Sequence, residues 1–100
     1  MDFENINIRQ IVSVALSYNA IIVDVRKREY FLNGHIPMAV SLPLAEIERG
    51  QVNLPKSKVL VVYCDTGGSS TQAARTLAGM GYRVINCIGG LKNYNASLTK

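Results

Sequence analysis

The sequence predicts an α/β domain built on a parallel sheet that is covered by helices on both faces. Two runs, Ile21–Val25 and Val59–Tyr63, are almost continuously apolar and rich in β-branched residues, which is typical of strands buried on both sides. Helical segments alternate with these runs at the spacing of strand–helix–strand units. Because 100 residues suffice for one hydrophobic core but not for two, we expect a single domain over residues 1–100.

Three further segments complete the expected strands. Arg83–Cys87 predicts a third strand. Ala39–Leu42 predicts a short strand, and Phe3–Ile6 predicts a strand at the edge of the sheet.

The expected helices lie between these strands. Asn7 is a favoured N-cap residue, and the apolar residues from Ile8 to Leu16 recur at helical spacing, so the first helix follows Asn7. The other expected helices cover residues 28–32, 44–49, 69–80 and 91–96. Gly50 and Gly81 come directly after two of them, as C-terminal stop signals do.

Composition excludes several classes of protein. With 48% hydrophobic and 18% charged residues, the chain is too apolar to be disordered. Its two cysteines, Cys64 and Cys87, are too few for a disulfide framework, and neither lies in a CxxC or Cys/His motif with metal-ligand spacing. We therefore expect no metal site, and the sequence implies no cofactor.

Charge and hydropathy indicate which kinds of partner and which compartment to expect. The net charge is +4, but the basic residues are scattered and only Arg26–Arg28 form a cluster, so we expect no nucleic-acid binding. No apolar segment approaches the length that spans a bilayer, and the first residues lack the features of a secretory signal. The sequence therefore predicts a soluble protein of a reducing compartment, the cytoplasm, without membrane contact.

Cys64 is the strongest functional candidate. It follows the apolar run Val59–Tyr63 and precedes the helical segment 69–80, so it lies at a strand-to-helix turn. In open parallel sheets the site lies beyond the carboxyl ends of the strands, where Asp24 also falls. The N-terminus of a helix presents unpaired N–H groups that favour an anion, including a cysteine thiolate.

An ordered set of short motifs resembles the rhodanese-like sulfurtransferase domain. It runs from Asp24 to Tyr94 and consists of Asp24-Val25-Arg26, Glu29-Tyr30, Gly34-His35-Ile36-Pro37, Tyr63-Cys64 with a glycine-containing loop, Gly81-Tyr82-Arg83-Val84 and Gly89-Gly90-Leu91. The resemblance implies a three-layer α/β/α fold with a five-stranded parallel sheet. It also implies a catalytic cysteine in a six-residue loop, here Cys64–Ser69, whose amides face the bound sulfur.

The resemblance implies sulfur transfer through a persulfide on Cys64. The thiolate takes a sulfane sulfur from thiosulfate, polysulfide or a persulfide donor, and a thiol or cyanide then removes it; a protein persulfide donor also fits. Glycine suits loops in which N–H groups approach an anion at positive φ, and hydroxyl groups add donors. The expected substrate-binding residues are Asp65, Thr66, Gly67, Gly68, Ser69 and Ser70, and Ser69 or Ser70 is the expected N-cap of the next helix.

Three other functions are open at this point. A cysteine phosphatase of the same fold needs Arg at position 70, where this chain has Ser. A silent rhodanese-like module would serve in protein binding, although such modules usually lose the cysteine. A persulfide carrier loaded by a protein donor fits Ser69, because many rhodaneses have an Arg there that this chain lacks.

The remaining polar candidates have structural interpretations beside the functional ones. We expect His35 to make a structural hydrogen bond, Asp24 to pair with Arg26, and Cys87 to fill the core. Lys92 is the expected cation near the site, with a solvated helix position as the equal alternative.

Overall fold

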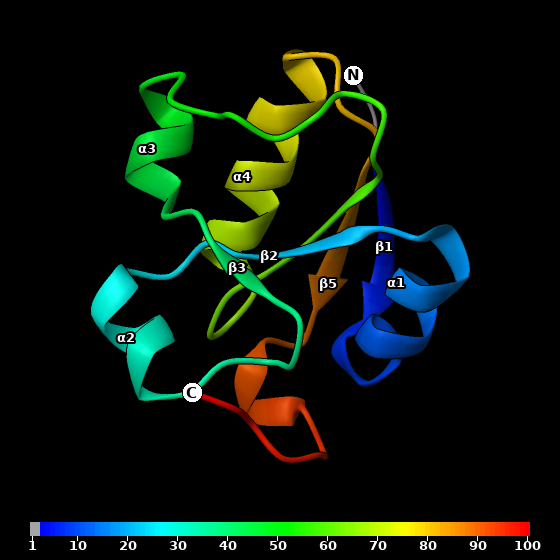
Figure 1. Cartoon of the computed structure of the whole chain (residues 1–100), viewed down its shortest axis with the longest axis vertical. Coiled ribbons are helices and arrows are strands. Elements are labelled where there is room, and N and C mark those ends of the chain that lie inside the picture. Colours follow the sequence, from blue (N-terminus) through cyan, green and yellow to red (C-terminus); the bar gives the residue numbers. More distant parts are fainter. Residues whose placement is uncertain (1–2) are drawn as a thin grey trace.

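The computed structural model, which describes residues 3–100, contains one five-stranded sheet in the order β1-β5-β4-β2-β3, with every neighbouring pair parallel (Figure 1). The strands are β1 (Glu4–Asn7), β2 (Ile21–Asp24), β3 (Val40–Ser41), β4 (Leu60–Tyr63) and β5 (Val84–Ile88). The central strand β4 is apolar and buried along its whole length, because it must bury both faces. The five-stranded α/β architecture predicted from the sequence is confirmed.

The helices are α1 (Ile11–Tyr18), α2 (Arg28–Asn33), α3 (Leu44–Glu48) and α4 (Gly68–Gly79), with 3₁₀ turns η1 (Ile8–Gln10) and η2 (Leu91–Asn93). Asn7 caps η1 as expected: its side chain accepts from the N–H of Arg9 at 2.9 Å, while Gln10 accepts from the N–H of Asn7. Within residues 3–100, no helix is long and apolar enough to cross a bilayer.

Two apolar layers enclose the sheet. One is built by α3 and α4, with Ile47 and Leu77 against Val62, and the other by η1 and α1 against the opposite face. Successive residues of β4 point to opposite layers, so Cys64 lies among the α4 side chains while Tyr63 lies with α1. This alternation places the sulfur of Cys64 beside the N-terminal end of α4.

Three local expectations are wrong. The last helix is a single 3₁₀ turn, because Tyr94 adopts an extended conformation and packs on the core, and the chain continues to a backbone bridge between Thr99 and His35. Neither Ser69 nor Ser70 caps α4, since its N-cap is Gly67. Gly68 does not have the positive φ expected of a loop glycine, because it is the first residue of the right-handed helix.

Candidate active site

Two backbone amides converge on the sulfur of Cys64. The Sγ atom accepts hydrogen bonds from the N–H of Gly67 at 3.0 Å and from the N–H of Ser70 at 3.2 Å. Gly67 makes this possible because its φ of +103° turns the chain back toward the cysteine, a conformation that residues with a Cβ rarely adopt. The first turn of the twelve-residue helix α4 therefore presents its free N–H groups to the sulfur.

The loop residues expected at the site have different roles in the structure. Asp65, Thr66 and Ser69 line a pocket together with Cys64. The hydroxyl of Ser70 is buried and donates to the carbonyl of Gly67 at 3.2 Å, so this residue faces the sulfur with its N–H and not with its side chain. Gly68 neither lines the pocket nor donates to the sulfur.

The turn after β5 packs directly against the cysteine loop. The N–H of Leu91 donates to the carbonyl of Cys64 at 2.9 Å, which ties the two loops together. Gly90 has a φ of +70°, and a Cβ there would overlap the carbonyl of Asp65 and lie 2.7 Å from the Cα of Thr66. Backbone therefore contacts backbone at this position, and only glycine fits without moving the loop.

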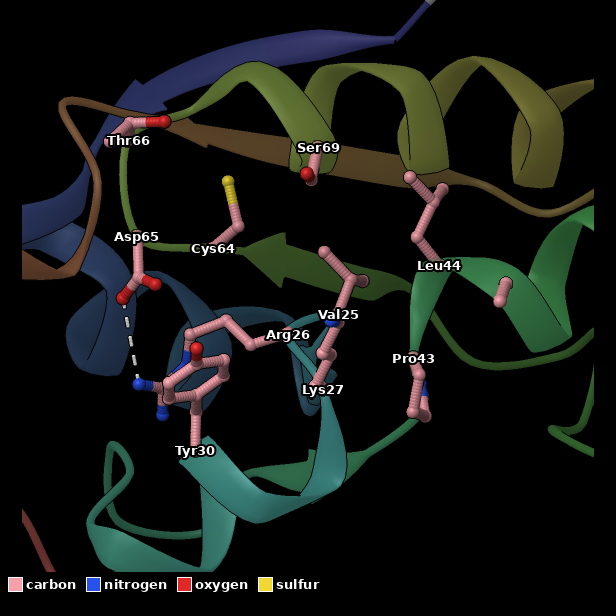
Figure 2. Close-up of a pocket in the computed structure, with 11 residues that line it drawn as sticks. Val25, Arg26, Lys27, Tyr30, Pro43, Leu44, Cys64, Asp65, Thr66 and Ser69 are labelled. Atoms are coloured by element: carbon pink, nitrogen blue, oxygen red, sulfur yellow. Dashed lines mark ion pairs between the residues drawn. The ribbon is translucent and has the colours of Figure 1, made fainter.

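The pocket beside Cys64 has a volume of about 490 Å³ (Figure 2). Its polar side consists of Arg26, Lys27 and Tyr30, which come from the end of β2 and the start of α2. The apolar side consists of Val25, Pro43, Leu44 and Ala45, and Figure 2 shows the labelled members of this side across the pocket from Asp65 and Thr66. The thiol thus opens onto a space with one charged and one apolar side.

A buried polar network fixes Arg26. Its guanidinium binds the carboxylate of Asp24 through Nε and Nη2, with a shortest distance of 2.7 Å, and Nη2 also donates to the carbonyl of Gly34. The hydroxyl of Tyr63 donates to Asp24 at 2.6 Å and accepts from the N–H of Ile36. The expected pairing of Asp24 with Arg26 is confirmed.

The buried network keeps both Tyr63 and Arg26 protonated. Burial and the hydrogen bond to Asp24 raise the pKa of Tyr63 well above its usual range, so this hydroxyl stays protonated and donates. Burial alone would lower the pKa of Arg26, but the hydrogen bond and the charge of Asp24 outweigh it and raise that pKa. Arg26 is therefore a permanent cation at a fixed position.

Asp65 makes a second ion pair with Arg26. Its Oδ1 is 3.6 Å from Nη1 of Arg26, and its side chain is 59% exposed whereas that of Arg26 is 8% exposed (Figure 2). Lys92, the cation expected from the sequence, does not line the pocket, and Arg26 and Lys27 take its place. The sequence could have identified Arg26 and Lys27 as site residues, because they belong to its only basic cluster, which follows a strand that ends at the site.

The other candidates lie apart from the cysteine loop. His35 contacts the carbonyl of Phe31 through Nδ1 at 2.9 Å and stacks on the Phe31 ring, so the expected structural role is confirmed. Cys87 is fully buried in the layer on the opposite face from Cys64. Within residues 3–100 there is no group of three or more His, Cys, Asp or Glu side chains placed to hold a metal ion.

Comparisons with known proteins agree with this geometry. The family model of the rhodanese-like domain matches residues 12–97. A thiosulfate sulfurtransferase of Escherichia coli (strain K12) is 38% identical over 73 residues, covering 71% of this chain and 70% of that protein. A tRNA sulfurtransferase of Desulfurococcus amylolyticus is 39% identical over 82 residues, which cover 82% of this chain but 16% of that protein. A Bacillus subtilis relative is likewise longer, and the match spans 40% of it.

Solved structures share the whole fold. A protein from Staphylococcus saprophyticus superposes with a TM-score of 0.85 at 26% identity, covering 98% of this chain and 100% of that one. A rhodanese homologue from Thermus thermophilus superposes with a TM-score of 0.74 at 28% identity, covering 89% and 98%. The five-stranded sheet, the cysteine loop at the start of α4 and these matches together place the chain in the rhodanese-like domain family.

Proposed function

We propose that this protein transfers sulfane sulfur through a persulfide on Cys64. The thiolate attacks the outer sulfur of a donor, the bond from that sulfur to the rest of the donor breaks, and the leaving group departs with the electron pair. With thiosulfate the leaving group is sulfite, and with a polysulfide or persulfide it is a shorter sulfide or a thiolate. A thiol or cyanide then attacks the outer sulfur of the persulfide and regenerates the Cys64 thiolate.

The observation that carries the proposal is the pair of amides on the sulfur of Cys64. Two fixed N–H donors are placed to stabilise negative charge on a sulfur at this position, as in the persulfide anion. No histidine is needed, because the attacking thiolate carries no proton to remove. Relatives named thiosulfate sulfurtransferase and tRNA sulfurtransferase support this reaction class.

Thiosulfate is expected to be a poor donor. Two cations line the pocket, Arg26 and Lys27, and two carboxylates offset their charge: Asp65, which also lines the pocket, and Asp24, which binds Arg26 from outside the lining. No arginine of the loop is available, since position 69 is Ser. A dianion therefore meets no net positive charge at the site.

A cysteine phosphatase is disfavoured by the same loop. The residue at position 70 is a buried serine whose hydroxyl donates to the carbonyl of Gly67, so the loop supplies no guanidinium, and that of Arg26 is already bound to Asp24. The silent binding module remains the competing function, and it differs from the proposal in one respect: its cysteine would not accept sulfur.

Intact-mass spectrometry after incubation with thiosulfate or polysulfide distinguishes a sulfurtransferase from a silent binding module. We expect one added sulfur in the native protein, none in Cys64→Ser, and one in the matched control Cys87→Ser. If no donor adds sulfur although Cys64 reacts readily with an alkylating agent, the binding module is the better interpretation. If Cys87→Ser loses the adduct and Cys64→Ser keeps it, the assigned nucleophile is wrong.

A further inference from the structure

The pocket next to Cys64 is much larger than an inorganic sulfur donor. A water molecule occupies roughly 30 Å³ in the liquid, and thiosulfate has only five heavy atoms. The pocket of about 490 Å³ instead lies within the range of roughly 300–1,000 Å³ that is usual for organic ligands. Most of this space would stay empty or wet with thiosulfate bound.

The apolar residues that line the pocket also favour an organic ligand. The apolar lining residues lie after the end of β2 and at the start of α3: Val25, Pro43, Leu44 and Ala45. Such a surface gains nothing from a small anion, but it favours a carbon skeleton, because the contact removes apolar surface from water on both partners. Figure 2 shows Val25 and Leu44 facing the space in front of Cys64.

Lys27 supplies a positive charge at the wall of the pocket. Among residues 3–100 it takes part in no ion pair, whereas the charge of Arg26 is already bound by Asp24. Lys27 is exposed and immediately precedes α2, where its side chain makes no capping hydrogen bond. It is therefore free to pair with a carboxylate of a ligand.

We propose that the donor is a low-molecular-weight organic persulfide whose carbon skeleton lies on the apolar side and carries a carboxylate that pairs with Lys27. The inference rests on the sulfur transfer proposed above and names its substrate class. The Cys64 thiolate attacks the terminal sulfur of R–S–SH, the S–S bond of the donor breaks, and R–S⁻ leaves with the electron pair. The product is Cys64–S–SH, so atoms, charge and oxidation states balance without an oxidant or reductant.

The test compares single-turnover loading of Cys64 by three donors. These are the persulfide of mercaptopropionate, the uncharged persulfide of mercaptoethanol, and thiosulfate. The native protein is expected to load fastest with the mercaptopropionate persulfide and slowest with thiosulfate. Lys27→Gln should lower the ratio of the charged to the uncharged persulfide by about threefold to fivefold, as an exposed ion pair would.

Ala45→Trp tests the apolar side independently. Ala45 is exposed on α3, so a larger side chain can be placed there without entering the core, and it would fill part of the pocket. The ratio of mercaptopropionate persulfide to thiosulfate loading should fall about tenfold or more. Lys92→Gln is the matched control, since it removes an exposed lysine that does not line the pocket, and it should leave both ratios unchanged.

The outcomes separate the two proposals. If thiosulfate loads Cys64 as fast as the organic persulfides, or if Lys27→Gln and Ala45→Trp leave the ratios unchanged, the organic substrate is wrong while sulfur transfer stands. If none of the three donors loads Cys64, the sulfur transfer itself is wrong.

Discussion

The two cysteines of this chain have nearly the same exposure and opposite surroundings. Cys64 follows β4 and Cys87 lies in the neighbouring strand β5, and the two residues are 3% and 0% exposed. The sulfur of Cys64 accepts two backbone N–H groups and opens onto a pocket. Cys87 lies in an apolar layer, and burial raises the pKa of its thiol to about 12. The difference lies in the backbone donors that each sulfur can reach.

The chain after β4 turns directly into a twelve-residue helix whose first N–H groups face the strand end. Cys87, by contrast, lies inside the sheet, where β5 pairs with β1 on one side and with β4 on the other. Free N–H groups stabilise an anionic sulfur, and an apolar layer destabilises it. Burial alone therefore does not distinguish a nucleophile from a core residue, whereas the available donors do.

Alkylation should show the largest difference between the two thiols. Because the pKa of Cys87 is raised to about 12, only roughly one molecule in ten thousand carries its thiolate at pH 8. We expect iodoacetamide to modify one cysteine in the native protein and two after denaturation, with peptide mapping assigning the native site to Cys64. Equal labelling of both thiols in the native protein would remove the basis of the comparison.

Gly90→Ala should damage the Cys64 site from the turn that follows the strand of Cys87. The new Cβ would overlap the carbonyl of Asp65, and φ is +70°, so the cysteine loop must move. We expect a loss of roughly 2–4 kcal/mol in the free energy of unfolding and at least a tenfold lower rate of persulfide formation at Cys64. Denaturant unfolding and single-turnover loading measure the two effects.

Gly79→Ala is the control for that substitution. Gly79 lies in α4, and a Cβ there has no neighbour within 4 Å, so alanine should be neutral or stabilise the helix by about 0.5–1 kcal/mol. A Gly90→Ala protein that loads sulfur as fast as Gly79→Ala would show that the contact between the two loops is unimportant.

The raised pKa of Cys87 should also make stability depend on pH. Between pH 9 and about 12 the thiol is ionised in the unfolded chain but protonated in the folded one, so the unfolded state binds fewer protons. The free energy of unfolding should therefore fall with rising pH, by up to about 1.4 kcal/mol per pH unit from this group. Cys87→Ala should show a correspondingly smaller slope in urea titrations, while an identical slope would contradict the assignment.

Ser70→Ala should have the smallest effect. The lost hydroxyl donates to the carbonyl of Gly67, which also accepts from the hydroxyl of Thr71 at 2.7 Å, and the N–H of residue 70 still faces the sulfur. We expect a cost of about 1 kcal/mol in the free energy of unfolding and less than a threefold change in loading. A much larger loss of loading would mean that the hydroxyl, and not the amide, holds the sulfur.

The fold could be predicted because its information is local. The apolar runs of β2 and β4 and the helical spacing after Asn7 are visible in the sequence, and they fix the layers. The position of Cys64 at the start of α4 follows from the same pattern. The helix expected at 91–96 is wrong because Tyr94 gains more from packing on the core than from continuing a helix, and such tertiary contacts are not visible in a propensity.

The charged side of the pocket could be predicted only in part. Arg26 and Lys27 follow a strand that ends at the site, but their place beside Cys64 depends on strand order, which puts β2 next to β4. The pairing of Arg26 with Asp65 joins two loops that are far apart in sequence. The contact of Gly90 with the cysteine loop likewise arises only from the adjacency of β4 and β5.

A crystal structure of the protein after treatment with a sulfane donor would show which sulfur atom carries the transferred sulfur and which groups hold it. We expect one additional sulfur bonded to Sγ of Cys64, within hydrogen-bond distance of backbone N–H groups of residues 65–70, and an unmodified Cys87. An additional sulfur on Cys87, or one on Cys64 that points to the apolar side without any N–H donor, would contradict persulfide formation in the amide loop of Cys64.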